Sequence, residues 1–532
     1  MEATGNSWDY LVVGAGHNGL CAAATIAESG HSVCVVEQLP VLGGLSASLP
    51  YIGDAPDHKL SLGAMDDMFM AQTSLAEDMR LADHGYSPIP MEHPYGWIGD
   101  DGETLLLFHD FERTVEDIRH FSRADADAYR QLRKTTDWLM DVQDDLVPVH
   151  PGSLGKRGML KLLLKHRPDR EVRRTLGRMF QMNIFELIDE TFESDPMRGL
   201  WAYWTSMVGP AEIDGTGVYM TAFAGVHRGR GVLRPRGGMT NLVEAFAGVL
   251  KDNGGDVRLG AGVERILVER GKAVGVRLTD GTELAASEAV ISSAAPQITL
   301  GRLLEPGTLD RTMENKVRMM PINSVNAAAF KIDMAVAGRV GYPQAEGLRK
   351  GRDGADIRKT TFMTGTLEQH IDQMLAMKRG DNVDYPPPVY MAILSASDPT
   401  IAPEGGDVFY LHSNVPARVN GGWADQKPSY EKTIVESAKR FVGGLEAEVG
   451  RMVNTPEDFE NRFSAPAGGY FHVDMLPTRL GMNRPAHGLG GYETPIAHLY
   501  LSGAGTHPGG GVSGWPGRLA AQHALSRNGG SK

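Results

Sequence analysis

The chain contains 532 residues, of which 42% are hydrophobic and 22% charged, and its 53 basic and 66 acidic residues give a formal net charge of −13. This composition excludes a mainly disordered chain, and the acidic balance argues against a nucleic-acid partner. The chain has two cysteines, Cys21 and Cys34, which excludes a disulfide framework and a cysteine-based zinc site, and we predict no metal site. The length suits about two to four domains or one large α/β assembly.

The N-terminus carries no basic run of the kind that begins a signal peptide. The apolar stretch at residues 10–27 is long enough to suggest a membrane span, but glycines and polar residues interrupt it. We therefore expect a cytoplasmic protein that does not span a membrane and at most rests on a membrane surface.

A βαβ unit follows directly. Apolar runs predict buried strands over residues 10–14 and 31–36, and a run of small residues predicts a helix over 20–29. The turn before this helix, Gly14-Ala15-Gly16-His17-Asn18-Gly19, has Gly-x-Gly-x-x-Gly spacing. The first glycine allows the turn, the second lets a pyrophosphate approach the backbone, and the third lets helix and strand pack closely. The unit therefore predicts a dinucleotide site at the N-terminus of the helix.

Two features after the second strand indicate which dinucleotide is bound. Glu37 ends that strand, where a carboxylate can accept hydrogen bonds from a ribose diol. The segment Leu42-Gly43-Gly44-Leu45-Ser46 follows, and its glycine pair lets the backbone pass a longer ligand, as in FAD proteins related to glutathione reductase, which it resembles. We predict FAD rather than NAD; the alternative for this glycine pair is a plain surface turn.

The middle of the chain alternates helical and strand patterns. Residues 110–223 are mainly helical, and residues 239–252 predict a further helix. Strands are predicted at residues 233–238, 256–259, 263–269, 273–278, 282–284, 288–293, 324–333, 389–395 and 408–415, a long amphipathic helix at 429–453, and loops over the Gly- and Pro-rich stretch 341–388. Pieces like the first unit recur at the middle and the end, which predicts a discontinuous cofactor domain carrying a substrate domain.

The C-terminal region carries a second glycine motif. A predicted strand at residues 499–502 precedes seven glycines within residues 503–517, and a helix is predicted from Arg518 to Ser526. Backbone with so few side chains suits a flat ring lying against the main chain. The N-terminus of the following helix could then face the anionic side of a reduced flavin.

With both ends described, the chain resembles the phytoene desaturase-related flavoproteins, which include bacterial carotenoid desaturases and retinol saturases. The similarity is closer to the branch containing the pyridine nucleotide-disulphide oxidoreductase domain-containing protein. It spans nearly the whole chain and is carried by residues 14–19, 234–242, 274–296, 471–474, 484–485 and 503–517. The resemblance implies a noncovalent FAD, an amine-oxidase-like architecture, and oxidation or saturation of C–C bonds in an apolar substrate.

The resemblance also implies particular contacts with FAD. The residues that would hold the pyrophosphate are Gly14, Ala15, Gly16 and Gly19, with Asn18 beside them. Glu37 would bind the adenosine ribose, Gly44 would lie near the phosphates, and Val263 would offer its backbone to adenine. The residues expected along the ribityl chain and the ring are Gly503, Gly510 and Val512. Two positions depart from the family pattern: Leu45 stands where many relatives have arginine, and Ala504 where many flavoproteins have an acid.

Other features bear on the path of the electrons. A disulfide reductase needs a close cysteine pair, whereas Cys21 and Cys34 are thirteen residues apart on the predicted helix and strand. Residues 260–262, Gly-Ala-Gly, lack the third glycine and the trailing acid of a second dinucleotide unit. We therefore expect electrons to leave to oxygen, a quinone or a diffusible partner.

His507 is the first candidate for acid–base chemistry, because the glycine segment is expected to place it beside the ring. The alternative is a hydrogen bond that shapes the loop. His472 and Asp474 are second candidates, and His17 is expected to be a neighbour of the pyrophosphate. Four aromatic residues are candidates for a cavity wall, against plain core packing: Tyr203, Trp204, Tyr219 and Trp515.

Residues 156–178 form a basic amphipathic stretch. Nine basic residues stand against Asp169 and Glu171, a local net charge of +7, and leucines are interleaved. Such a stretch could rest on anionic lipid and let an apolar substrate pass to a cavity; a solvated helix or a subunit contact is the alternative.

These observations predict an α/β protein with a discontinuous Rossmann-type FAD-binding domain, an α+β substrate domain and a helical cap. We assign residues 1–80, 225–300 and 490–532 to the FAD-binding domain, and 81–224 and 301–489 to the substrate domain with its cap. The predicted function is FAD-dependent desaturation of a largely apolar small molecule. A redox-neutral double-bond isomerase and a flavin-bound, non-catalytic interaction protein are the alternatives, and the oligomeric state is left open.

Overall fold

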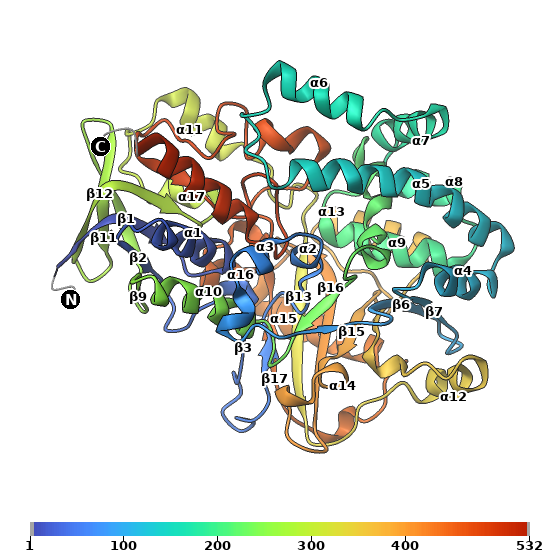
Figure 1. The fold of residues 1–532 in the computed structure, drawn as a ribbon. Helices are drawn as coiled ribbons and strands as arrows, with labels where there is room; N and C mark the ends of the chain where they lie inside the picture. Colours follow the sequence, from blue (N-terminus) through green and yellow to red (C-terminus); the bar gives the residue numbers. More distant parts are fainter. Residues whose placement is uncertain (1–4, 529–532) are drawn as a thin grey trace.

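The computed structural model describes residues 5–528, which form two mixed sheets and a helical cap (Figure 1). The first sheet has seven strands in the order β10-β11-β12-β1-β2-β9, with β18 beside β12. β1 pairs in parallel with β12 on one side and β2 on the other, so the carboxyl ends of these strands meet at one edge. The strands are β1 (Ser7–Val13), β2 (Val33–Val36), β9 (Asp256–Arg258), β10 (Val263–Glu269), β11 (Lys272–Leu278), β12 (Glu283–Ser292) and β18 (Leu499–Leu501).

Three helices from distant parts of the chain cover one face of this sheet: α1 (His17–Glu28), α10 (Thr240–Asp252) and α17 (Trp515–Asn528) (Figure 1). They pack closely because small residues lie where they meet. A Cβ on Gly517 would lie 1.9 Å from the carbonyl oxygen of Asn18. The N-terminal unit, the middle of the chain and the C-terminal segment therefore form one Rossmann-type α/β body.

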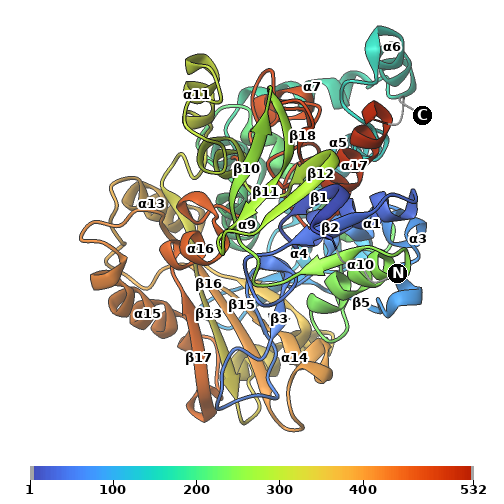
Figure 2. The ribbon, with the colours of Figure 1, turned by 90° about the vertical axis from the view of Figure 1, so that its left-hand side faces the viewer.

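The second sheet also has seven strands, in the order β17-β13-β16-β15-β14-β6-β7, and Figure 2 shows it below the first. Its long central pair, β13 and β16, is antiparallel. Apolar side chains of one face, such as Phe330 and Ile332, pack against α12 (Pro343–Arg352) and α15 (Trp423–Lys439), while α9 (Asp195–Val208) and α13 (Leu367–Lys378) cover the other face. The strands are β6 (Tyr95–Ile98), β7 (Thr104–Leu107), β13 (Ala327–Val336), β14 (Thr361–Met363), β15 (Tyr390–Ile393), β16 (Asp407–Pro416) and β17 (Glu448–Asn454).

The helical cap consists of consecutive helices at the upper right of Figure 1. Polar residues set several of its boundaries: Ser122, Asp169 and Asn183 each accept, through the side chain, a backbone amide hydrogen bond from three residues further on. The cap helices are α4 (Phe111–Arg119), α5 (Arg123–Leu146), α6 (Gly155–Lys165), α7 (Arg170–Gln181) and α8 (Ile184–Thr191).

Shorter elements connect these bodies. They are β3 (Ser48–Leu49), β4 (Leu60–Ser61), β5 (Pro88–Pro90), β8 (Leu233–Pro235), α2 (Met68–Ala71), α3 (Leu75–Asp78), α11 (Arg311–Arg318), α14 (Leu394–Ser397) and α16 (Pro456–Phe463). Within residues 5–528 no helix is both long and apolar enough to cross a bilayer.

Three predicted elements are wrong. β12 is one strand where two were expected, at residues 282–284 and 288–293. The two parts are continuous because β1 pairs with β12 along most of its length, with only one register shift. The stretch 341–388 is not all loop: it contains α12, β14 and α13, and a capping box between Thr366 and Gln369 begins α13. The helix expected at 429–453 ends at Lys439, and residues 448–454 form β17 instead.

Candidate functional site

A cavity with about 1040 Å³ of space lies where the carboxyl ends of β1 and β2 meet the start of α1. We call it the sheet-edge cavity. Ligands of parallel α/β sheets bind at this edge. Its wall includes these residues that the sequence predicts as FAD contacts: Gly14, Gly16, Asn18, Glu37, Gly44 and Val263.

The three glycines of the N-terminal turn have different environments. Gly14 has a φ of +95°, which favours glycine, and a Cβ on it would lie 2.6 Å from the Ser293 hydroxyl oxygen. A Cβ on Gly19 would lie 1.9 Å from the carbonyl oxygen of Gly14, so this glycine is needed for α1 to pack on the turn. A Cβ on Gly16 would meet no heavy atom within 4 Å. Gly16 therefore leaves space for a ligand, next to first-turn amides of α1 that no side chain caps.

Glu37 lies in the same wall but is already engaged with the backbone. Its carboxylate accepts hydrogen bonds from the amides of Ala15 (2.7 Å) and Leu39 (2.8 Å), and burial raises the pKa of this carboxyl. Each carboxylate oxygen keeps a second lone pair that can accept a ribose hydroxyl. Ala15 therefore donates a hydrogen bond to Glu37 and does not line the cavity.

Several buried polar atoms in this wall have no hydrogen-bond partner among the described residues: His17 Nε2, Asn18 Oδ1 and His472 Nδ1. His17 also contacts the Ser46 hydroxyl through Nδ1 at 3.1 Å, and burial lowers the pKa of His17 to about 4. Buried polar atoms are normally satisfied, so these atoms indicate a polar ligand. Together with the open space at Gly16, they mark this wall as the side on which a polar ligand binds.

The C-terminal glycine segment is arranged differently from what the sequence suggests. Of the described residues 503–517, Ala504 lines the sheet-edge cavity. Gly503 lies against the carbonyl oxygen of Ser293, and a Cβ on Gly510 would lie 1.9 Å from the ring of Phe471. Val512 is buried in the core around α1. Contacts of Gly503, Gly510 and Val512 with FAD stay predictions, because side chains lie against this backbone in the structure.

The structure does not bring His507 to the predicted site. Its Nε2 contacts the carbonyl oxygen of Leu146 at 3.1 Å, and burial lowers its pKa to about 4. Neither His507 nor Trp515 is among the residues that line the sheet-edge cavity. His507 thus connects the glycine segment to the end of α5, which is the loop-shaping alternative.

A second, smaller cavity lies between the end of α9 and the start of β13. We call it the α9 cavity. His472 and Tyr470 line both cavities, so the loop that carries them separates the two. Burial lowers the pKa of His472 to about 4, with a smaller contribution from the charge of Arg484. Asp474 lines the α9 cavity but accepts hydrogen bonds from the amides of Asn323 and Ser324.

Arg484 holds this loop and was missed as a functional residue in the sequence. It is fully buried, and its guanidinium donates hydrogen bonds to four carbonyl oxygens, those of Phe471, Val473, Asp474 and Ala504. Burial lowers the pKa of Arg484 to about 10. Arg484 therefore joins the loop between the cavities to the segment that begins the glycine motif. Arg484 lies in a Gly- and Pro-rich stretch, and no pattern in the sequence there indicates that it is buried.

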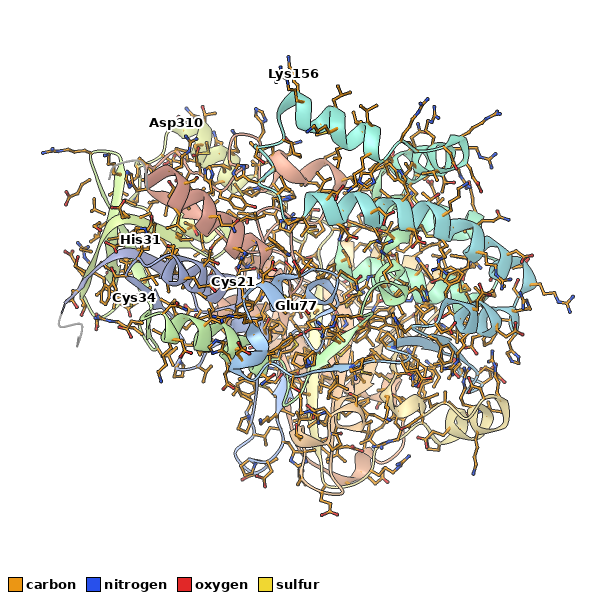
Figure 3. The ribbon with its side chains drawn as sticks, in the orientation of Figure 1. Cys21, His31, Cys34, Glu77, Lys156 and Asp310 are labelled. Atoms are coloured by element: carbon orange, nitrogen blue, oxygen red, sulfur yellow. The ribbon has the colours of Figure 1, made fainter. Side chains whose placement is uncertain are left out.

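The aromatic candidates lie mainly in the core. Tyr203 and Trp204 of α9 are buried, and the Tyr203 hydroxyl contacts His412. The two cysteines are also buried and free, Cys21 on α1 and Cys34 on β2, and Figure 3 shows them at separate places. Burial raises the pKa of both thiols to about 12, so neither is a reactive thiolate.

Comparison with known proteins agrees with this geometry. A model of flavin containing amine oxidoreductases matches residues 152–369, and a model of the NAD(P)-binding Rossmann-like domain matches residues 12–65. Pyridine nucleotide-disulfide oxidoreductase domain-containing protein 2 of Mus musculus is 30% identical, over 98% of this chain and 94% of that protein. A phytoene desaturase (neurosporene-forming) of Rhodobacter capsulatus is 28% identical, over 94% of this chain and 90% of that protein. The solved structure of cyclohexylamine oxidase from Brevibacterium oxydans has a TM-score of 0.57 at 15% identity, covering 98% of this chain and 99% of that one, which shows the fold.

Fold, cavity and matches define an FAD-dependent oxidoreductase with an amine-oxidase-like architecture. The chain belongs to the phytoene desaturase-related flavoprotein family, together with the mouse protein and the phytoene desaturases. Its cofactor is FAD, bound noncovalently as is typical of the class.

Proposed function

We propose that this protein is a dehydrogenase that desaturates a CH–CH bond of a largely apolar small molecule. The observation that carries the proposal is the loop at Tyr470 and His472, which lines both the sheet-edge cavity and the α9 cavity. A cofactor in the first cavity and a substrate in the second would meet at this loop. The names of the phytoene desaturase relatives support desaturation as the reaction.

In this proposal the residues of the chain bind FAD and orient it. The Gly14–Gly19 turn and the α1 amides bind the pyrophosphate, and Glu37 orients the adenosine ribose. FAD, when bound, accepts a hydride from a substrate C–H bond. The neighbouring carbon loses a proton, and His472 is placed to accept it, because its Nδ1 is unpartnered and its lowered pKa keeps the ring neutral at pH 7. Arg484 positions His472 through the loop carbonyls. Oxygen or a quinone would serve as the final electron acceptor.

The test is anaerobic bleaching of the visible flavin absorption by candidate substrates, followed by reoxidation with air or a soluble quinone. Desaturation predicts bleaching, a product with one more double bond, and reoxidation. A redox-neutral isomerase would change the substrate with no net consumption of acceptor. An FAD-loaded protein that is unreactive toward substrates and artificial acceptors would support the interaction-protein alternative.

We also propose that α6 rests on an anionic membrane surface. Figure 1 shows α6 at the outer edge of the cap, with Lys156 at its tip in Figure 3, and none of its residues is buried. Leu160, Leu163 and Leu164 are 57%, 61% and 69% exposed. Lys156 and Lys161 form no ion pair with any other described residue. Exposed leucines beside unpaired cations match the chemistry of an acidic lipid surface.

A further inference from the structure

One buried face of the second sheet carries several polar side chains on β13 and β16. Paired residues of β13 and β16 project from the same face, and the register pairs Lys331 with His412 and Asp333 with Tyr410. Lys331 and Asp333 are fully buried and form an ion pair, and the Lys331 Nζ lies 3.3 Å from the centroid of the Tyr410 ring. The opposite face of the same strands is apolar, with Phe330, Ile332, Met334, Phe409 and Leu411.

Two side chains of this polar face line the α9 cavity without satisfying their own polar atoms. His412 and Asn414 are 2% and 4% exposed, and both line the cavity. His412 Nε2 and Asn414 Nδ2 have no hydrogen-bond partner among the described residues. They stand two positions apart on β16, so about 7 Å separates their Cα atoms and both point to the same side.

The hydrogen bonds around His412 determine what its free nitrogen can do. The Tyr203 hydroxyl donates its one proton to the backbone carbonyl of His412 at 2.9 Å. The 3.0 Å contact between this hydroxyl and Nδ1 must then have Nδ1–H as the donor. His412 Nε2 is left as a bare acceptor, while the Asn414 amide is a donor. Burial, with a smaller effect of Lys331, lowers the pKa of His412 to about 3, so the ring is neutral.

The acceptor of His412 and the donor of Asn414 lie side by side, so they suit a ligand group that can both donate and accept a hydrogen bond. A hydroxyl does so without charge, whereas a protonated amine cannot accept the Asn414 proton and would bring a second cation near Lys331. Much of the remaining wall is apolar and includes Met207, Val208, Ile322, Val325 and Ala328. A hydrocarbon would leave both polar atoms unpaired, which is unfavourable in a buried site.

We propose that the α9 cavity binds a hydroxyl-bearing apolar molecule through His412 and Asn414, so that the substrate is an alcohol rather than a pure hydrocarbon or an amine. This inference rests on the proposed function, since it takes the α9 cavity as the substrate site.

The test uses three probes of the same shape with the FAD-loaded protein: benzyl alcohol, ethylbenzene and benzylamine. Isothermal titration calorimetry gives the ratio of the dissociation constants of ethylbenzene and benzyl alcohol. We expect this ratio to fall about tenfold in His412→Phe, and to fall similarly in Asn414→Leu. The second variant keeps the test decisive if the first does not fold.

The matched control is His370→Phe. His370 is a buried histidine of α13 that also packs against the Tyr203 ring, but it does not line the α9 cavity. This variant should leave the ratio unchanged. An unchanged ratio in both cavity variants, no binding of benzyl alcohol to the wild type, or tighter binding of benzylamine would overturn the inference. A protein that passes this test but whose flavin no substrate reduces would refute the proposed function and not the alcohol site.

Discussion

Two alanine substitutions in the N-terminal turn, Gly16→Ala and Gly19→Ala, should affect FAD binding and folding separately. At Gly16 the new methyl group meets no protein atom within 4 Å, and the φ of −71° is open to any residue. The Gly16→Ala protein should therefore fold normally, with its methyl group in space that the pyrophosphate needs. At Gly19 the methyl group would lie 1.9 Å from the carbonyl oxygen of Gly14, so Gly19→Ala forces α1 away from β1.

The two magnitudes follow from these contacts. Displacing the pyrophosphate from one α1 amide loses a charge-assisted hydrogen bond of about 1.5–3 kcal/mol, which raises the FAD dissociation constant roughly 10- to 100-fold in Gly16→Ala. Its free energy of unfolding without FAD should change by less than about 0.5 kcal/mol. Gly19→Ala should lower the free energy of unfolding by about 1–3 kcal/mol or more, because the overpacked contact is with backbone.

Fluorescence titration of the FAD-free protein measures the first quantity and urea unfolding measures the second. Gly347→Ala is the control, because Gly347 lies on exposed α12 and a Cβ there also meets nothing within 4 Å. It should leave FAD binding unchanged. The reasoning fails if Gly16→Ala binds FAD as tightly as the wild type, or if it loses as much stability as Gly19→Ala.

Three further predictions concern Arg484, the buried histidines and α6. Arg484→Met leaves four carbonyl oxygens without their donor and should lower the free energy of unfolding by about 3 kcal/mol, as measured in urea. The pKa of His370 is lowered to about 3, so the unfolded state binds more protons below pH 6.5 and stability falls as pH falls. His370→Phe should therefore reduce the slope of unfolding free energy against pH by about 1.4 kcal/mol per pH unit between roughly pH 6 and 4. Replacing Leu163 and Leu164 by Asp should weaken binding to vesicles of phosphatidylcholine and phosphatidylglycerol at least about tenfold in a sedimentation assay.

Each of these has its own control. Arg265 also donates to backbone carbonyls but is partly exposed, so Arg265→Met should cost less than about 1 kcal/mol. An equal loss in both arginine variants would contradict the role given to Arg484. If His370→Phe left the slope of unfolding free energy against pH unchanged, the pKa of His370 would be the same in the folded and unfolded states. Equal binding to pure phosphatidylcholine vesicles would contradict an acidic lipid partner for α6.

The N-terminal half of the cofactor site could be predicted because its information is local. Strand, glycine turn, helix, second strand and Glu37 follow one another within about thirty residues, and each glycine has one steric reason to be there. The structure places Gly14, Gly16 and Glu37 in the wall of one cavity. Apolar patterns also predicted the strands of the first sheet one by one, although β12 was expected as two strands.

The rest of the site depends on contacts between distant segments. The sequence could not show that Phe471 lies against Gly510, or that Leu146 contacts His507, because neither pair is related by a periodic pattern. His472 was a second candidate on the sequence, and we now favour it because it lines both cavities. The helices within 341–388 were missed because Gly and Pro residues hide short apolar faces between them.

The loop between the cavities explains why Arg484 is fully buried although no carboxylate of the described residues lies within hydrogen-bond distance of it. Burying a guanidinium is costly, and carbonyl oxygens satisfy it less strongly than a carboxylate would. A carboxylate would fix the arginine alone, however, whereas four carbonyls fix the backbone from Phe471 to Asp474 together with Ala504. That backbone carries His472 and adjoins Tyr470, and Ala504 begins the segment beside the sheet-edge cavity. Arg484 therefore fixes the loop that lies between the two cavities, and in the proposed reaction this loop would determine how closely substrate and cofactor approach each other.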